Sequence, residues 1–104
     1  MRRPELIDKI KTVIRTVEPN ATVILYGSEA RGEARPDSDI DLLILLDTEQ
    51  LTESHKTRIA YPLYDLALET GVHVSPRIYT RKEWFGRPFK TPFYVNVMNE
   101  GIEL

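Results

Sequence analysis

The apolar positions of this chain change their spacing from one stretch to the next. Over residues 4–18, apolar side chains recur at three- and four-residue intervals, which predicts a helix with one apolar face. Pro4 suits the first turn of this helix and Pro19 ends it. Residues 21–26 and 39–46 are apolar without alternation, which predicts two strands that are covered on both faces.

A second helical stretch is predicted over residues 49–70. Pro62 lies inside it, and an interior proline costs roughly 3 kcal/mol, so we expect a kink or a new helix near this residue. Residues 72–79 predict a third strand, in which Pro76 indicates a bulge or a sheet edge. The remaining predicted elements are a short turn over 81–85, a helix over 92–100 and a short edge strand over 102–104.

Length and composition limit the classes of protein that this chain can represent. Its 104 residues fit one small domain, residues 1–104, and a hydrophobic fraction of 41% allows a real but thin core. No stretch approaches the about 20 apolar residues of a membrane-spanning helix. The N-terminus has no signal-peptide core, so we expect a cytoplasmic location. The lack of cysteine excludes disulfides, and a net charge of −2 argues against a duplex-DNA binder while leaving a nucleotide substrate open.

A glycine and a serine follow the first predicted strand. Gly27-Ser28 ends that strand and opens a short helical turn, which we expect to reach about Glu33. Unpaired backbone N–H groups at such a turn attract phosphate, and the Ser28 hydroxyl adds a donor. An ordinary strand-to-helix turn with a serine cap fits the same residues, so Gly-Ser alone does not decide between the two.

Two carboxylates stand at the start of the second predicted strand. Asp39 and Asp41 are two residues apart, so both side chains project from the same face. Like charges beside the apolar run 42–46 repel each other and resist desolvation unless a cation or donors compensate. Mg²⁺ prefers carboxylate and phosphate oxygens and would compensate them. Alternatively, the two carboxylates lie at the start of the strand and are simply solvated. The Gly-Ser turn about a dozen residues earlier makes this alternative weaker than a metal site.

Two arginines flank the loop between these points. Arg31 and Arg35 can each bind phosphate in bidentate geometry. They can equally pair with the acidic side chains of the loop and organise it, and the residues leave both interpretations open. Ser38, directly before the acidic pair, is of a type that favours turns.

These features combine into one motif with a specific spacing. It reads Gly27-Ser28-x-x-Arg31-Gly32, then Arg35, then Ser38-Asp39-x-Asp41-Leu42. The motif resembles that of the polymerase-β-type nucleotidyltransferase superfamily, and the chain is similar to its small bacterial and archaeal members, the minimal nucleotidyltransferases (MNT). The resemblance implies an α/β (α+β) domain of nucleotidyltransferase fold, with a short mixed β-sheet and helices packed mainly on one face.

The resemblance also implies an enzyme that transfers a nucleoside monophosphate to an acceptor, and we expect AMP from ATP. The residues then assigned to the nucleotide are Gly27, Ser28, Arg31, Arg35 and Ser38. Asp39 and Asp41 would hold Mg²⁺ and so align the α-phosphate. Members of this type are commonly paired with a HEPN-type helical partner, some as antitoxins that adenylylate the toxin. Because the chain is short, we expect a partner protein or a second copy of the chain to supply the surface that holds the acceptor.

One position departs from the family pattern. The superfamily places a third acid on the next strand, where it completes the metal site and helps to deprotonate the acceptor. The matching stretch is residues 72–75, and His73 stands where that acid is expected. His73 can serve as base or metal ligand, given an unperturbed pKa of about 6.5, or it is an outward-facing residue without a role. If the site is weak or inactive, the domain is instead an antitoxin-like or regulatory binding module.

A cluster of aromatic residues lies near the C-terminus. Its members are Trp84, Phe85, Phe89, Phe93 and Tyr94. They suit a partner-binding or base-stacking surface, but packing of the final helix onto the sheet explains most of them more simply.

Overall fold

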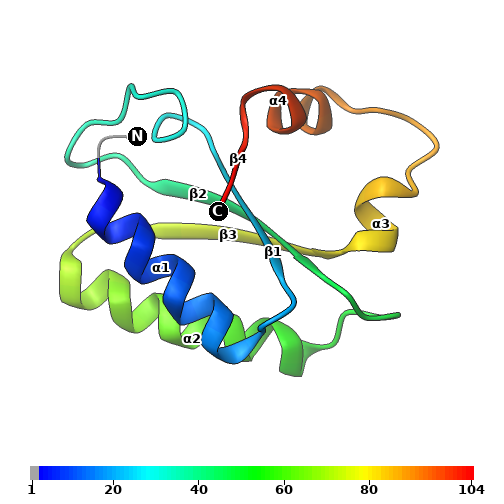
Figure 1. Cartoon of the computed structure of the whole chain (residues 1–104), viewed down its shortest axis with the longest axis horizontal. Helices are drawn as coiled ribbons and strands as arrows, with labels where there is room; N and C mark the ends of the chain where they lie inside the picture. Colours follow the sequence, from blue (N-terminus) through cyan, green and yellow to red (C-terminus); the bar gives the residue numbers. More distant parts are fainter. Residues whose placement is uncertain (1–2) are drawn as a thin grey trace.

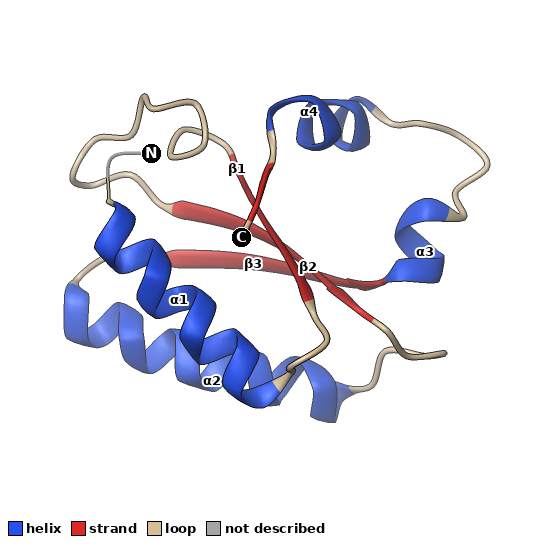
Figure 2. Cartoon of the chain, in the orientation of Figure 1, coloured by secondary structure: helices blue, strands red, loops and turns tan. Residues whose placement is uncertain are grey.

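The computed structural model describes residues 3–104, which contain both helices and strands (Figures 1 and 2). The elements are α1 (Pro4–Val17), β1 (Thr22–Tyr26), β2 (Ile40–Leu46), α2 (Glu53–Thr70), β3 (Val74–Thr80), α3 (Arg81–Phe85), α4 (Pro92–Glu100) and β4 (Ile102–Glu103). The predicted strands and helices therefore all exist, with ends that shift by a few residues.

The strands form one four-stranded sheet in the order β3-β2-β1-β4. β1 is antiparallel to β2 and to β4, whereas β2 is parallel to β3. A parallel pair needs a long crossover, and α2 supplies it. The sheet is mixed, as predicted, and β3 lies at its edge, where Pro76 removes no ladder bond from a central strand.

The two long helices, α1 and α2, cover one face of the sheet, and the shorter α3 and α4 lie against the other (Figure 1). The larger core lies under the long helices: Ile7, Ile10, Ile14, Val23, Leu25, Ile40, Leu42, Ile44, Leu46, Ile59, Leu63 and Leu66. The smaller core lies under the short helices: Ile24, Leu43, Leu45, Trp84, Tyr94 and Val97. Consecutive side chains of β2 pack on opposite faces of the sheet, alternately into the larger and the smaller core. This explains why the sequence of β2 is apolar without alternation.

The α2 helix runs without interruption through Pro62, so no new helix begins there. It starts at Glu53 rather than at residue 49, because Thr52 and His55 form a capping box. Gly71 ends it with a φ of 75°. No helix among residues 3–104 is both long and apolar enough to span a bilayer.

The start of α1 is fastened to the loop after β1. Glu29 is fully buried, and its carboxylate accepts hydrogen bonds from the Arg3 backbone N–H at 3.1 Å and from Arg3 Nε at 2.6 Å. A buried carboxylate needs such a partner. This pair fixes the loop that carries Gly27 and Ser28 against the helix layer.

Candidate active site

The predicted Gly-Ser turn and the second aspartate lie on neighbouring strands. Tyr26, the last residue of β1, pairs with Asp41 of β2, so Gly27 follows directly beside the Asp41 carboxylate. Gly27 has a φ of +77°, and a Cβ atom there would collide with Asp41 Oδ2. Glycine is therefore required twice at this position, once for the backbone conformation and once for the approach of the carboxylate.

The short helical turn predicted after Gly27 is present as a single turn, which ends at Gly32 and does not extend into a helix. Arg31 N–H donates to the Gly27 carbonyl at 3.1 Å, and then Gly32 takes a φ of +74°. Gly32 N–H returns to the Glu29 carbonyl at 3.2 Å, and Glu33 N–H returns to the Ser28 carbonyl at 2.9 Å. These two hydrogen bonds form the Schellman motif that terminates helices, and here the motif follows directly after the single turn that begins at Gly27.

Ser28 keeps its donors available to a ligand. Within residues 3–104, its carbonyl accepts one bond, whereas its N–H and hydroxyl have no hydrogen-bond partner. Ser28 lies at the same end of the sheet as Gly27, since the two residues are consecutive.

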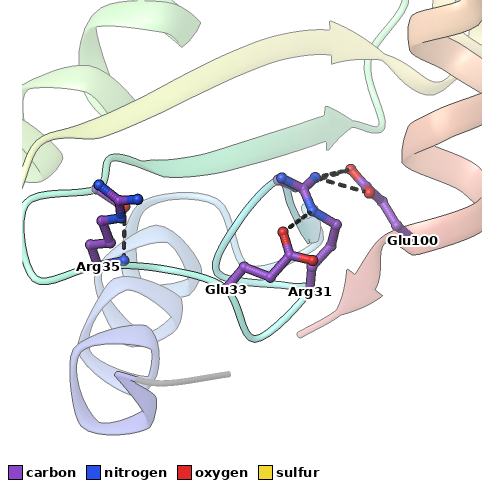
Figure 3. Close-up of polar contacts among 6 residues, drawn as sticks. Arg31, Glu33, Arg35 and Glu100 are labelled. Atoms are coloured by element: carbon purple, nitrogen blue, oxygen red, sulfur yellow. Dashed lines mark hydrogen bonds and ion pairs between the residues drawn. The ribbon is translucent and has the colours of Figure 1, made fainter.

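Arg31 is held by two carboxylates, as Figure 3 shows. Its Nε lies 3.2 Å from Glu33 Oε2, and its Nη1 lies 3.1 Å from Glu100 Oε2. Glu100 Oε1 also accepts the backbone N–H of Gly27 at 3.2 Å. These contacts raise the pKa of Arg31, with Glu100 the larger cause and Glu33 the next. The sequence left pairing with loop acids open, but Glu100 lies 69 positions from Arg31 and no local signal indicates it.

Arg35 and Ser38 close the loop before β2. Arg35 N–H donates to Ser38 Oγ at 2.9 Å, and Ser38 N–H donates to the Arg35 carbonyl at 3.0 Å. Ser38 is thus a turn former in this structure, as its residue type indicated. The Arg35 guanidinium is exposed and makes no ion pair in the part of the chain that the structure describes.

The two members of the acidic pair differ in their contact with water. Asp39 is exposed, whereas Asp41 is half-buried, and burial raises the pKa of the Asp41 carboxyl, followed by the negative charge of Asp39. The positive charges of Arg77 and Arg31 oppose that shift. A cation bound by both carboxylates would offset their repulsion and the partial desolvation of Asp41. The donor set therefore fits a hard divalent ion such as Mg²⁺.

His73 lies beside the first aspartate. Its Nδ1 is 3.4 Å from Asp39 Oδ2, and both side chains are more than half exposed, at 65% and 57%. The β2–β3 register pairs Asp41 with Ser75, so Ser75 rather than His73 lies directly opposite the second aspartate. No cluster of three His, Cys, Asp or Glu suited to a metal occurs among residues 3–104. Mg²⁺ usually takes one or two carboxylates and completes its shell with substrate phosphates and water, so two suffice.

A cation, Arg77, and two rings, Tyr26 and Phe93, lie on the same face as Asp41, and of these three the sequence had indicated only Phe93 as a candidate. The Arg77 guanidinium stacks 4.8 Å above the Phe93 ring, and Tyr26 meets Phe93 edge-on at 5.5 Å. Burial raises the pKa of Tyr26, and the charge of Asp41 raises it further. The aromatic cluster therefore divides into three parts. Trp84 and Tyr94 pack in the core, Phe85 and Phe89 are exposed, and Phe93 packs against Tyr26, the strand partner of Asp41.

A groove of about 520 Å³ opens between α2 and the start of β3. It is mostly apolar, and it reaches His73 and Ser75 at the edge of the acidic site.

Comparison with known proteins identifies the family of this chain. Residues 7–103 match the nucleotidyltransferase domain. The chain belongs to the nucleotidyltransferase domain family. It is 34% identical over 102 residues to a protein of Methanocaldococcus jannaschii named "putative protein adenylyltransferase", and the match covers 96% of both chains. A stretch of 60 residues, 55% of this chain, is 40% identical to 6% of the bifunctional uridylyltransferase/uridylyl-removing enzyme of Rhodospirillum rubrum.

Solved structures agree with this assignment. A structure described as a putative minimal nucleotidyltransferase superposes with a TM-score of 0.63 at 30% identity, covering 100% of this chain and 97% of the other. A toxin–antitoxin crystal structure with AMP-PNP superposes with a TM-score of 0.64 at 22% identity, covering 92% of this chain and 69% of the other. The first supports an MNT-type nucleotidyltransferase, and the second shows the shared fold.

Proposed function

We infer that this nucleotidyltransferase domain transfers AMP from ATP to a hydroxyl group of a partner protein. The observation that carries this inference is the contact between Gly27 and Asp41, which brings the turn with its N–H donors to the edge of the acidic pair. The relative named as a protein adenylyltransferase, which matches along almost the whole chain, supports AMP and a protein acceptor.

The residues divide between the triphosphate and the metal. The backbone N–H groups and hydroxyl of the Gly27-Ser28 turn and the Arg31 guanidinium bind the phosphates, with Arg35 at the rim of the loop. Asp39 and Asp41 would hold Mg²⁺, and the ion would neutralise phosphate charge and orient the α-phosphate. Ser38 shapes the loop that places this pair.

In the transfer step, the acceptor oxygen forms a bond to the α-phosphorus as the bond to the bridging oxygen of pyrophosphate breaks. The acceptor hydroxyl loses its proton, and pyrophosphate leaves with the electron pair of the broken bond. His73 is the candidate base, because it lies at the groove edge and Asp39 Oδ2 is close to its Nδ1. Nε2 is then the atom that takes the proton.

A transfer assay tests this function. The domain is co-expressed with the product of its neighbouring gene as the candidate partner, and the mass of that protein is measured. We expect a gain of one AMP that is lost in Asp39→Asn and Asp41→Asn. Asp47→Asn, at the exposed far end of the same strand, is the matched control and should retain the transfer. A partner that never gains mass, with the wild-type domain bound to it, contradicts the enzymatic role.

Two observations favour a second candidate, a binding module that pairs with a HEPN-type partner without transferring a nucleotide. His73 stands where the family resemblance predicts an acid, and Glu100 contacts two of the phosphate donors. In that case the partner binds tightly to wild type, Asp39→Asn and Asp41→Asn alike, and no adduct forms.

A further inference from the structure

A carboxylate from a distant element lies on the donors assigned to the triphosphate. Glu100 is the last residue of α4, and Gly27 follows β1, 73 positions earlier. Glu100 accepts hydrogen bonds from the Gly27 N–H and from the Arg31 guanidinium. Figure 3 shows its side chain pointing from α4 toward the loop that carries Arg31.

Both oxygens of this carboxylate are engaged, much as the oxygens of a bound phosphate would be. Oε1 lies 3.2 Å from the Gly27 nitrogen and 3.3 Å from Arg31 Nη1, and Oε2 lies 3.1 Å from the same Nη1. A backbone N–H carries one hydrogen, so Gly27 cannot donate fully to Glu100 and to a phosphate oxygen at once. The two anions therefore compete for this donor.

Charge makes the competition stronger. A triphosphate that entered beside Glu100 would meet a like charge at close range, and like charges disfavour each other's ionised form. Glu100 and the phosphates cannot share the subsite at low cost.

The position of Glu100 is not explained by the needs of its own helix. A carboxylate in the last turn of a helix opposes the helix dipole, which favours positive charge there. The helix end is closed by Gly101 N–H to the Val97 carbonyl at 2.8 Å, without the Glu100 side chain. The side chain is 26% exposed, so it can swing outward into water without leaving a buried charge.

We propose that Glu100 is an internal anion that occupies the triphosphate subsite, and that an incoming nucleoside triphosphate must displace it. The proposal rests on the proposed function, because it takes Gly27 and Arg31 as phosphate ligands. Glu100 then makes the affinity of the domain for the nucleotide lower than the phosphate ligands Gly27 and Arg31 alone would give.

Titration calorimetry with a non-hydrolysable ATP analogue and Mg²⁺ tests this proposal. Glu100→Gln removes the charge, and we expect at least about tenfold tighter binding, equivalent to about 1.4 kcal/mol. Glu100→Asp keeps the charge but shortens the reach, and it should also bind more tightly than wild type. Glu33→Gln is the matched control, because Glu33 contacts Arg31 but not the Gly27 N–H; it should stay within about threefold of wild type.

The possible results separate the two levels of inference. Equal or weaker binding by both Glu100 variants, with a wild type that binds, overturns the proposal and leaves the nucleotide site intact. Glu100 would then position Arg31 for the phosphates. If neither wild type nor any variant binds the analogue, the proposed function fails and the proposal fails with it. Circular dichroism of each variant confirms that the fold is retained.

Discussion

At the scale of single residues, the site depends on one glycine and one aspartate that touch. Gly27 ends β1 with a positive φ, and the Asp41 carboxylate fills the space where a side chain at Gly27 would be. The motif was readable in the sequence because its spacing is local. The contact itself was not, because it depends on which strands pair.

Gly27→Ala should destabilise the fold and abolish nucleotide binding. The positive φ costs a non-glycine residue about 1–2 kcal/mol, and the added Cβ would push the Asp41 carboxylate away as well. Gly71→Ala is a matched control, because Gly71 has a φ of +75° with no atom within 4 Å of the added Cβ. Chemical denaturation and ATP-analogue titration of both variants check this. Equal loss of stability, with nucleotide binding retained in both, would contradict the role given to Gly27.

Asp41→Asn should make the metal-free protein more stable at pH 7. Burial and then Asp39 raise the pKa of Asp41 above 3.8, so ionising this carboxyl costs folded-state stability. This loss of stability is absent below pH 3.8, where Asp41 is protonated in both the folded and the unfolded protein. It is complete above the raised pKa of the folded protein. The advantage of Asp41→Asn over wild type should therefore shrink as the pH falls toward 3.8.

Urea unfolding across that pH range, in the presence of a chelator, measures the effect. Asp47→Asn, on the exposed end of the same strand, provides the baseline for removing one carboxylate. A variant no more stable than wild type at pH 7 would mean that Asp41 is solvated, as the alternative interpretation of the sequence had it.

At the scale of elements, the sequence predicted the strands well because their apolar runs are continuous, and the helix predicted over 92–100 coincides with α4. It predicted the helical turn after β1, but not the hydrogen bonds at Gly32 that end this turn. It also placed the start of α2 too early, before Thr52 with its cap. Capping and termination depend on single side chains, which apolar periodicity does not report.

Glu29→Gln should loosen the junction between α1 and the nucleotide loop. The Glu29 carboxylate is fully buried and pairs with Arg3, so removing its charge leaves a largely buried cation without its partner. Breaking such a pair costs about 3–5 kcal/mol, which a shift of the urea midpoint would reveal. Glu33→Gln, at an exposed pair on the same loop, should cost less than about 1 kcal/mol. Equal midpoints for the two variants would show that the Arg3–Glu29 pair contributes little.

At the scale of the whole molecule, the site is assembled by strand pairing that no local pattern encodes. The β1–β4 ladder pairs Leu25 with Ile102 and so carries the end of α4, with Glu100, to Gly27. The β2–β3 register places Ser75 opposite Asp41 and brings His73 to Asp39. The family resemblance gave the fold and the acidic pair, whereas Glu100 and Arg77 became visible only in three dimensions.

The most direct test of the acidic site is a calorimetric titration of Mg²⁺ with a non-hydrolysable ATP analogue into wild type and Asp39→Asn. We expect wild type to bind the analogue more tightly with Mg²⁺ than without it, and Asp39→Asn to lose that dependence while Asp47→Asn keeps it. If Asp39→Asn shows the same Mg²⁺ dependence as wild type, the acidic pair is not the metal site.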